Sequence, residues 1–259
     1  MKKVSVFVYL LALAVAVAIP AGAQSNSKNI ARIFTIRTKP GQAQQWEGGL
    51  KKMTAWYHQQ NLPVTLYVWS VISGEDLGDY VLGEFGHDWA DFDQMQARGE
   101  KVGVGKEVEE TVAPYTESVK MSFYTFLPNM SSPITPGQKP MPMSEVTFFT
   151  LKPGGTEPVI NVIKQAGAAM AKTHWKGNGP GEWYALVDGG EGPQLVLSVG
   201  HENWAGFQEP SPSLTEMLAQ AYGKAGANAL GHEFDSHIRG IYSEIIRYRP
   251  DLSYIAPAK

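Results

Sequence analysis

The stretch Gly86-His87-Asp88-Trp89-Ala90-Asp91-Phe92 decides the fold, because it occurs twice. With one inserted residue it recurs as Gly200-His201-Glu202-Asn203-Trp204-Ala205-Gly206-Phe207. Lys39-Pro40-Gly41 likewise recurs as Lys152-Pro153-Gly154, in the same order along the chain. The copies start 114 and 113 residues apart (86 to 200 and 39 to 152), which is too long for the roughly 20- to 50-residue units of a solenoid. The sequence therefore predicts a duplicated domain.

Each half shows the same predicted order of elements: strand, helix, strand, strand, helix, strand. In the first half the apolar residues from Trp46 to Tyr57 recur at the spacing of one helical face, and Asp88 is a good N-cap for the second helix. We expect strands at 32–37, 64–72, 80–85 and 119–127, with helices around 46–57 and at 89–112. In the second half we expect strands at 145–151, 183–187, 194–199 and 241–249, with helices at 157–173 and 213–237.

The order βαββαβ is that of a ferredoxin-like unit, whose two helices cover one face of a four-stranded antiparallel sheet. The other face must be covered as well, and the strands here are apolar on both faces, as the neighbours Phe148 and Phe149 show. We therefore expect an α+β protein in which two tandem ferredoxin-like βαββαβ repeats pack as an α/β barrel, with the helices outside. The predicted organisation is a signal peptide at 1–23, a first repeat at 30–128, a linker at 129–143 and a second repeat at 144–254.

The first 23 residues have the pattern of a secretory signal peptide. Lys2-Lys3 gives a positive start, residues 7–19 form an apolar run, and Ala21-Gly22-Ala23 is a small-x-small cleavage site. An uncleaved N-terminal anchor is the alternative. No later stretch has the ~20 consecutive apolar residues that a membrane span needs. We expect an exported protein, periplasmic or extracellular, with no stable membrane span after cleavage.

Composition excludes several classes of protein. The chain has no Cys, which excludes disulfides, thiolate metal sites and cysteine nucleophiles. Its formal net charge of -3 and pI near 6.1 argue against a nucleic-acid partner, which needs a basic face. A small-molecule ligand stays open as a partner. A monomer follows if the halves cover each other, and a homodimer if each half pairs with another copy.

The duplication, the element order and the repeated segment resemble the dimeric α/β-barrel superfamily in a single-chain tandem form. The segment at 87–92 is similar to the strand end and helix start of antibiotic-biosynthesis-monooxygenase and stress-responsive barrel domains. We therefore expect it to open the second helix of each half. The layout is also distantly similar to that of chlorite-dismutase-like proteins. The resemblance covers nearly the whole mature chain and implies a fold rather than an activity, because the superfamily includes cofactor-free monooxygenases, haem enzymes and isomerases.

Two pairs of repeated positions are candidates for a ligand pocket. His87 and His201 end the third strand of each half, either facing a ligand at the barrel mouth or forming a structural corner shared by the repeats. Trp69 and Trp183 lie on the second strand of each half and either line a pocket or pack in the core. The ligand-pocket candidates are Trp69, His87, His174, Trp183 and His201. Catalytic residues stay unassigned.

His174 ends the first helix of the second half, as His58 does in the first half. The resemblance to chlorite-dismutase-like proteins implies a proximal haem ligand in this part of the chain. The loop Gly177-Asn178-Gly179-Pro180-Gly181, however, replaces the Thr-rich continuation of that family. The alternative is a helix-end histidine that contacts the last-turn carbonyls. Haem stays open as a cofactor.

His232 and His237 are the candidates for a metal site. They flank Glu233 and Asp235, and spacings of i, i+3 and i+4 bring imidazoles and carboxylates to one helical face. Such mixtures of ligands suit zinc or iron. A solvated helix end whose side chains pair with each other is the alternative, so a divalent metal also stays open as a cofactor.

Three classes of function remain. The first is an exported protein of undefined activity that binds a small apolar or aromatic ligand in an α/β-barrel pocket. The second is a haem-dependent or cofactor-free oxidoreductase, and the third is a structural or assembly protein of the envelope. The sequence has no dense polar constellation, which favours the first and third classes. Whether the protein is an enzyme stays open.

Overall fold

The computed structural model describes residues 28–133, 139–177 and 179–257. The predicted signal peptide lies outside the described residues, as does the part of the predicted linker from 134 to 138. In the described chain the predicted order of strands and helices occurs twice. The prediction of an α+β fold with two ferredoxin-like repeats is therefore confirmed.

The bounds of the elements are close to those predicted. The first half contains β1 (Ile30–Thr38), α1 (Ala43–Gln59), β2 (Tyr67–Val71), β3 (Tyr80–His87), α2 (Trp89–Val102), α3 (Val104–Thr111) and β4 (Thr116–Phe126). The second half contains β5 (Met143–Leu151), α4 (Thr156–Thr173), β6 (Gly181–Asp188), β7 (Gln194–His201), α5 (Leu214–His237) and β8 (Ile238–Tyr248). The short 3₁₀ helices are η1 (Ala113–Tyr115), η2 (Pro128–Met130) and η3 (Trp204–Phe207). Among the described residues, no helix is both long and apolar enough to cross a membrane.

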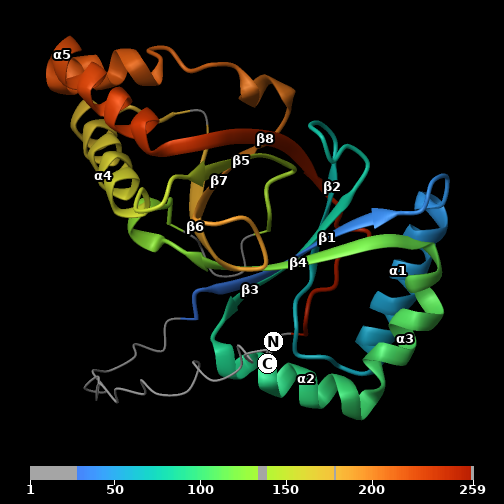
Figure 1. Cartoon of the computed structure of the whole chain (residues 1–259). Helices are drawn as coiled ribbons and strands as arrows, with labels where there is room; N and C mark the ends of the chain where they lie inside the picture. The colour runs from blue at the N-terminus through green and yellow to red at the C-terminus, as the bar shows by residue number, and fades with distance from the viewer. Residues whose placement is uncertain (1–27, 134–138, 178, 258–259) are drawn as a thin grey trace, which may run out of the picture.

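The eight strands form one closed antiparallel barrel in the order β1-β3-β2-β8-β5-β7-β6-β4. The two four-stranded sheets are joined where β2 pairs with β8 and where β4 pairs with β6. Helices α1 and α3 lie on one side of this barrel and α4 and α5 on another (Figure 1). The expected α/β barrel with its helices outside is confirmed, and the two sheets form its opposite walls.

The second helix of the first half differs from the prediction. The single helix expected at 89–112 is two helices, because Gly103 adopts a left-handed conformation with φ 86° between α2 and α3. The predicted N-cap is confirmed, since the Asp88 carboxylate accepts a hydrogen bond from the Asp91 backbone N–H at 2.9 Å. In the second half α5 has the predicted bounds, but the repeated segment does not open it, which corrects that part of the prediction. It forms η3, the prolines at 210 and 212 interrupt the chain, and α5 starts from a new capping box at Ser213.

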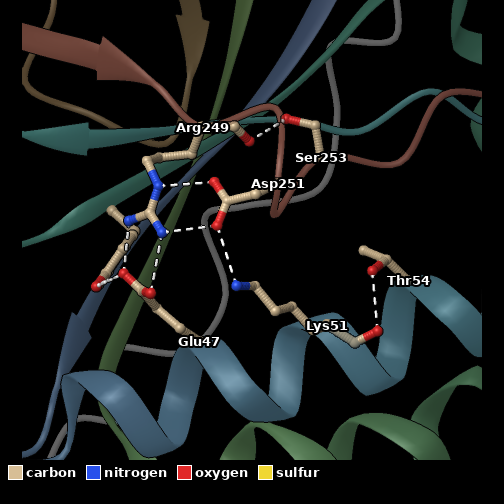
Figure 2. A network of polar contacts seen from close by, with 7 residues as sticks. Glu47, Lys51, Thr54, Arg249, Asp251 and Ser253 are labelled. Atoms are coloured by element: carbon tan, nitrogen blue, oxygen red, sulfur yellow. Dashed lines mark hydrogen bonds and ion pairs between the residues drawn. The ribbon is translucent and has the colours of Figure 1, made fainter.

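The C-terminal segment of the second half completes the core of the first. Leu252 and Tyr254 are fully buried against α1, and the Tyr254 hydroxyl donates a hydrogen bond to the Leu62 carbonyl at 2.7 Å. Before this segment, Arg249 forms a bidentate pair with Glu47 of α1 at 2.6 and 2.9 Å (Figure 2). Asp251 also accepts from Arg249, at 2.9 Å. The two halves are therefore held together by polar and apolar contacts as well as by the barrel.

Candidate functional site

One cluster of side chains lies inside the barrel. Strands β3 and β6 are not neighbours in the ring, yet the rings of Phe85 and Tyr184 lie 6.2 Å apart, which requires both to point inward. The Trp69 ring lies 6.0 Å from that of Tyr248 and 6.2 Å from that of Phe85. The cluster draws on every strand except β1 and contains Tyr67, Trp69, Val71, Val81, Phe85, Tyr124, Val146, Phe148, Tyr184, Val196, Ile246 and Tyr248. An eight-stranded barrel has room either for such packed side chains or for one small ligand.

Several of the inward-pointing rings remain only half-buried. Trp69 and Ile246 are buried, whereas Tyr67, Phe85 and Tyr248 keep part of their surface accessible to solvent. An aromatic side chain that points into a barrel and still has accessible surface has not been sealed by its neighbours. Tyr67, Phe85 and Tyr248 therefore point into the barrel and still keep accessible aromatic surface.

Glu244 is the buried carboxyl of this interior. Its neighbours two positions along β8, Tyr242 and Ile246, point to the same side of the strand, and Glu244 is only 6% exposed. The Tyr242 hydroxyl donates a hydrogen bond to it at 3.0 Å. Burial raises the pKa of the Glu244 carboxyl to about 7, and the negative charges of Asp76 and Asp79 add to the shift. This carboxyl therefore changes charge near neutral pH.

A second pair of tyrosine and carboxylate lies on β6. The Tyr184 hydroxyl donates a hydrogen bond to Glu182 at 2.7 Å, and both side chains share the inward face because they are two residues apart. Burial raises the pKa of Tyr184 well above its ordinary value, with Glu182 adding to the shift. This tyrosine stays protonated, so its hydroxyl is committed as a donor to Glu182.

The loop between β2 and β3 covers the Glu244 end of the barrel. The Ser73 hydroxyl accepts a hydrogen bond from the Ile245 backbone N–H at 2.8 Å. Gly74, at φ 90°, lies so close that a Cβ atom there would be 2.9 Å from the Tyr242 hydroxyl and 3.1 Å from the Glu244 Cβ. Glycine is required at position 74 because the neighbouring atoms leave no room for a Cβ atom and because a positive φ disfavours any other residue.

Charged residues lie on the same loop. Arg37 of β1 forms ion pairs with Asp76 at 3.0 Å and with Asp79 at 2.9 Å. The hydrogen bond and charge of Asp79 raise the pKa of Arg37. The positive charge of Arg37 is therefore engaged with the loop and not with Glu244.

The five ligand-pocket candidates do not come together. Trp69 lies at the centre of the aromatic interior described above. Trp183 does not, although it also lies on the second strand of its half. On β6 the inward positions are Glu182 and Tyr184, so Trp183 points outward, where it stacks on Phe149 at 5.7 Å beneath the helices. The two tryptophans therefore occupy opposite sides of the barrel wall.

His87 and His201 both form corners at the ends of β3 and β7. The His87 ring lies 5.2 Å from Phe92, and its Nδ1 lies 3.8 Å from the Asp91 carboxylate. Burial lowers the pKa of His87, which Asp91 opposes. His201 is 2% exposed, with its ring 4.0 Å from that of Phe207. Each histidine packs on the phenylalanine of its own repeated segment. This arrangement matches the alternative of a structural corner shared by the two repeats.

His174 lies at the surface. It ends α4 in a left-handed conformation with φ 54°, and it lines a groove with a volume of about 360 Å³. The groove is formed by residues 173–177, residues 210–212 and Gln220. A haem needs an enclosed apolar slot, whereas this groove lies at the surface and its lining includes Lys176, Ser211 and Gln220. The sheet face beneath the helices is occupied by Phe149 and Trp183. The residues at His174 therefore do not fit a haem.

The candidate metal ligands also lie apart from each other. The imidazole of His237 pairs with the Glu233 carboxylate at 3.1 Å, one turn away on α5, and His232 is exposed. Within the described ranges, no three His, Asp or Glu side chains are placed to hold a metal ion. The geometry matches the alternative of a helix end whose side chains pair with each other.

The carboxyls inside the barrel were missed by sequence reasoning. Tyr242-Ser243-Glu244 and Glu182-Trp183-Tyr184 each place a carboxylate and a tyrosine at alternate positions of a strand. Period-two alternation predicts that the two side chains share one face. It does not say which face is inside, because both faces of these strands carry apolar residues.

Comparison with known proteins gives a fold. No family model matches the chain, and no curated protein matches it by sequence. Among solved structures, an anthrone oxidase-like protein aligns with a TM-score of 0.55 and 16% identity, over 90% of this chain and 95% of that one. The chain has the dimeric α/β-barrel fold.

Further neighbours share this dimeric α/β-barrel fold. A putative monooxygenase from Lactobacillus acidophilus has a TM-score of 0.53 and 10% identity, over 89% of this chain and 97% of that one. The cyanide complex of a variant chlorite dismutase from Candidatus Nitrospira defluvii has a TM-score of 0.52 and 8% identity, over 88% and 93%. At these identities the similarity establishes the fold and leaves the chemistry to the residues of this chain.

Proposed function

We propose that this protein binds a small aromatic ligand inside its barrel, between Trp69 and Glu244. The observation that carries the proposal is an aromatic lining that stays half-buried and contains one carboxyl able to change its charge near neutral pH. Ligand sites are typically concave, mainly apolar, and furnished with a few polar groups that orient the ligand. Strongly shifted carboxyls are also more frequent at functional sites than elsewhere.

The name of one structural neighbour is compatible with this ligand class. Anthrone, in the description of the anthrone oxidase-like protein, is a fused aromatic ketone. A flat ring system of this kind is suited to offset or edge contacts with Trp69, Phe85 and Tyr248. The proposal takes only the aromatic character of the ligand from this comparison.

The test is calorimetric titration of the purified protein with 2-naphthol at pH 7. We expect saturable binding of one molecule, weakened at least tenfold in Trp69→Ala. Because Trp69 is buried and its loss can unfold the barrel, Tyr184→Phe serves as a second variant that removes only a hydroxyl. Trp204→Ala, at an exposed tryptophan, is the matched control and should bind normally.

The outcomes locate the site. An absence of binding in the wild type overturns the proposal. Binding that is lost in His174→Ala but kept in Trp69→Ala and Tyr184→Phe places the ligand in the surface groove beside α4 and also overturns it. If Trp204→Ala binds normally, a loss of affinity in Trp69→Ala is not a general effect of removing a tryptophan.

Glu244 supports a second candidate function, a cofactor-free oxidation. A carboxylate with a pKa near 7 is suited to remove an acidic proton from a bound aromatic ligand. With anthrone as the probe, loss of that proton would precede reaction with O₂ to give anthraquinone and water. Oxygen uptake that requires Glu244, tested with Glu244→Gln, would support this function, and uptake equal in the variant would exclude Glu244 as the base.

A further inference from the structure

Two carboxyls that point into the barrel lack a cationic partner. Glu182 and Glu244 both point inward, from β6 and β8. Among the described residues, neither carboxyl forms an ion pair with a Lys, Arg or His side chain. Each has instead the hydroxyl of a neighbouring tyrosine as its hydrogen-bond donor. A buried carboxylate normally has a cationic partner or becomes neutral.

Arg37 does not supply that partner. Arg37 lies at the same end of the barrel, but its guanidinium is held by Asp76 and Asp79 on the covering loop. Asp76 and Asp79 also act on Glu244 and are negative, whereas Tyr242 on its own strand and Tyr124 on β4 are neutral. The surroundings of Glu244 therefore favour the binding of a cationic ligand.

The aromatic lining favours the same charge. The face of a Trp or Tyr ring attracts a cation within roughly 6 Å of its centre, and the attraction strengthens when water is excluded. Trp69, Tyr67 and Tyr248 lie within 6.2 Å of one another as a connected group of rings. Rings of this kind combined with a carboxylate form the usual site for an organic ammonium ion.

We propose that the ligand of the barrel is an aromatic compound carrying a positively charged amine, with Glu244 as its counter-ion. This inference rests on the proposed function, because it specifies the ligand of the same site. When the cation binds, the protonated carboxyl of Glu244 releases its proton to solvent and pairs with the ammonium group. The proton balance is therefore one proton released for each cation bound by the neutral form.

The experiment compares three ligands that share an indole ring. Tryptamine is a cation at neutral pH, tryptophol is neutral and indole-3-acetate is an anion, so the series varies charge at nearly constant ring contact. Each is titrated into the wild type by calorimetry at pH 6 and pH 8. We expect tryptamine to bind at least tenfold more tightly than tryptophol at pH 8, and indole-3-acetate to bind most weakly.

The pH and the variants test the role of Glu244. Tryptamine affinity should rise between pH 6 and pH 8, because binding at pH 6 must first remove the proton from Glu244. In Glu244→Gln both the tenfold preference for tryptamine and its pH dependence should disappear. Glu202→Gln, which removes an exposed carboxyl after β7, is the matched control and should retain both.

The results separate this inference from the proposed function. If tryptophol binds as tightly as tryptamine, the charge inference is wrong while aromatic binding in the barrel stands. If none of the three ligands binds, both are wrong. If the preference for tryptamine survives in Glu244→Gln but is lost in Glu182→Gln, the counter-ion is Glu182. That result overturns the inference as stated.

Discussion

The helix layers of the two halves differ in how completely they are packed against the barrel. In the first half, 13 buried residues form one continuous core that includes Trp46 and Leu50 of α1. In the second half, the described residues between the sheet and the helices include only three buried members, Leu151, Val159 and Leu195. A further three, at Ala169, Met217 and Ala221, lie between α4 and α5. The two halves therefore share the order of their elements but differ in how many apolar residues they bury between sheet and helices.

Part of the difference arises at the end of the chain. Leu252 and Tyr254 follow β8 in sequence but belong to the core of the first half. The corresponding segment after β4 leads into η2, at Pro128–Met130, and includes no buried residue. Because burial of apolar surface contributes roughly 25 cal/mol per Å², the first half receives stabilisation that the second half provides and does not receive in return.

Tyr254→Ala should have the largest effect, because it opens the first-half core at the residue supplied by the second half. The side chain is fully buried and its hydroxyl is hydrogen-bonded to Leu62. We expect a loss of about 3–5 kcal/mol in the free energy of unfolding, measured by urea denaturation. Ile255→Ala, at an exposed position next to it, should lose less than about 0.5 kcal/mol. Similar losses in the two variants would contradict the assignment of Tyr254 to the core.

Two leucines compare a fully buried position of the first layer with a half-buried position of the second. Leu50 of α1 is fully buried in the first half, whereas Leu197 of β7, which pairs with the outward-pointing Trp183, is half-buried in the second. We expect Leu50→Ala to cost about 2–5 kcal/mol and Leu197→Ala about 1 kcal/mol, because a partly exposed site leaves a smaller cavity. Equal losses in urea denaturation would show that the second layer is packed as tightly at Leu197 as the first layer is at Leu50.

Much of this fold could be predicted from the sequence, for local reasons. The repeated segment, the alternating strands and the Asp88 cap depend on residues close together in the chain, and the element order follows from them. The second-half helix lies where it was predicted, but the expectation that the repeated segment opens it was wrong, because Pro210 and Pro212 interrupt the chain between the segment and the helix. A repeat in sequence is therefore weaker evidence for a helix boundary than the prolines that follow it.

The candidate site was less predictable, because it depends on the direction in which each strand faces. Trp69 and Trp183 occupy second strands of the two halves but point to opposite sides of the barrel. Glu244 gives no signal until the ring of strands shows that its face is the inside. A shift of one residue in register reverses every side chain of a strand, and the register is set by pairing between segments far apart in the chain.

The barrel interior, shared by both halves, should respond to pH. The pKa of Glu244 is about 7 in the folded protein, against 4.5 for an ordinary glutamate. Because this pKa is raised, ionisation opposes folding: the cost is absent below about pH 4.5, grows as the pH rises, and is complete above about pH 7. We expect the stability of Glu244→Gln relative to the wild type to increase by roughly 2–4 kcal/mol from pH 4.5 to pH 8. The free energies of unfolding are measured by urea denaturation at both pH values. If the difference between the variant and the wild type is the same at both, Glu244 is an ordinary, solvated carboxyl.

The smallest loss in the free energy of unfolding is expected at the ion pair between the two halves. Arg249 pairs with Glu47 and Asp251, and the Tyr80 hydroxyl donates to the same Glu47 oxygen at 2.7 Å (Figure 2). Arg249 and Glu47 keep about a quarter of their side-chain surface exposed, at 23% each, so solvent screens the pair and we expect Arg249→Met to cost about 1–3 kcal/mol. A double-mutant cycle with Glu47→Gln isolates the pair, and a coupling energy near zero would mean that Leu252 and Tyr254 hold the C-terminal segment on α1 without it. A coupling of 1 kcal/mol or more would instead make this ion pair part of what directs the end of the second half onto the core of the first.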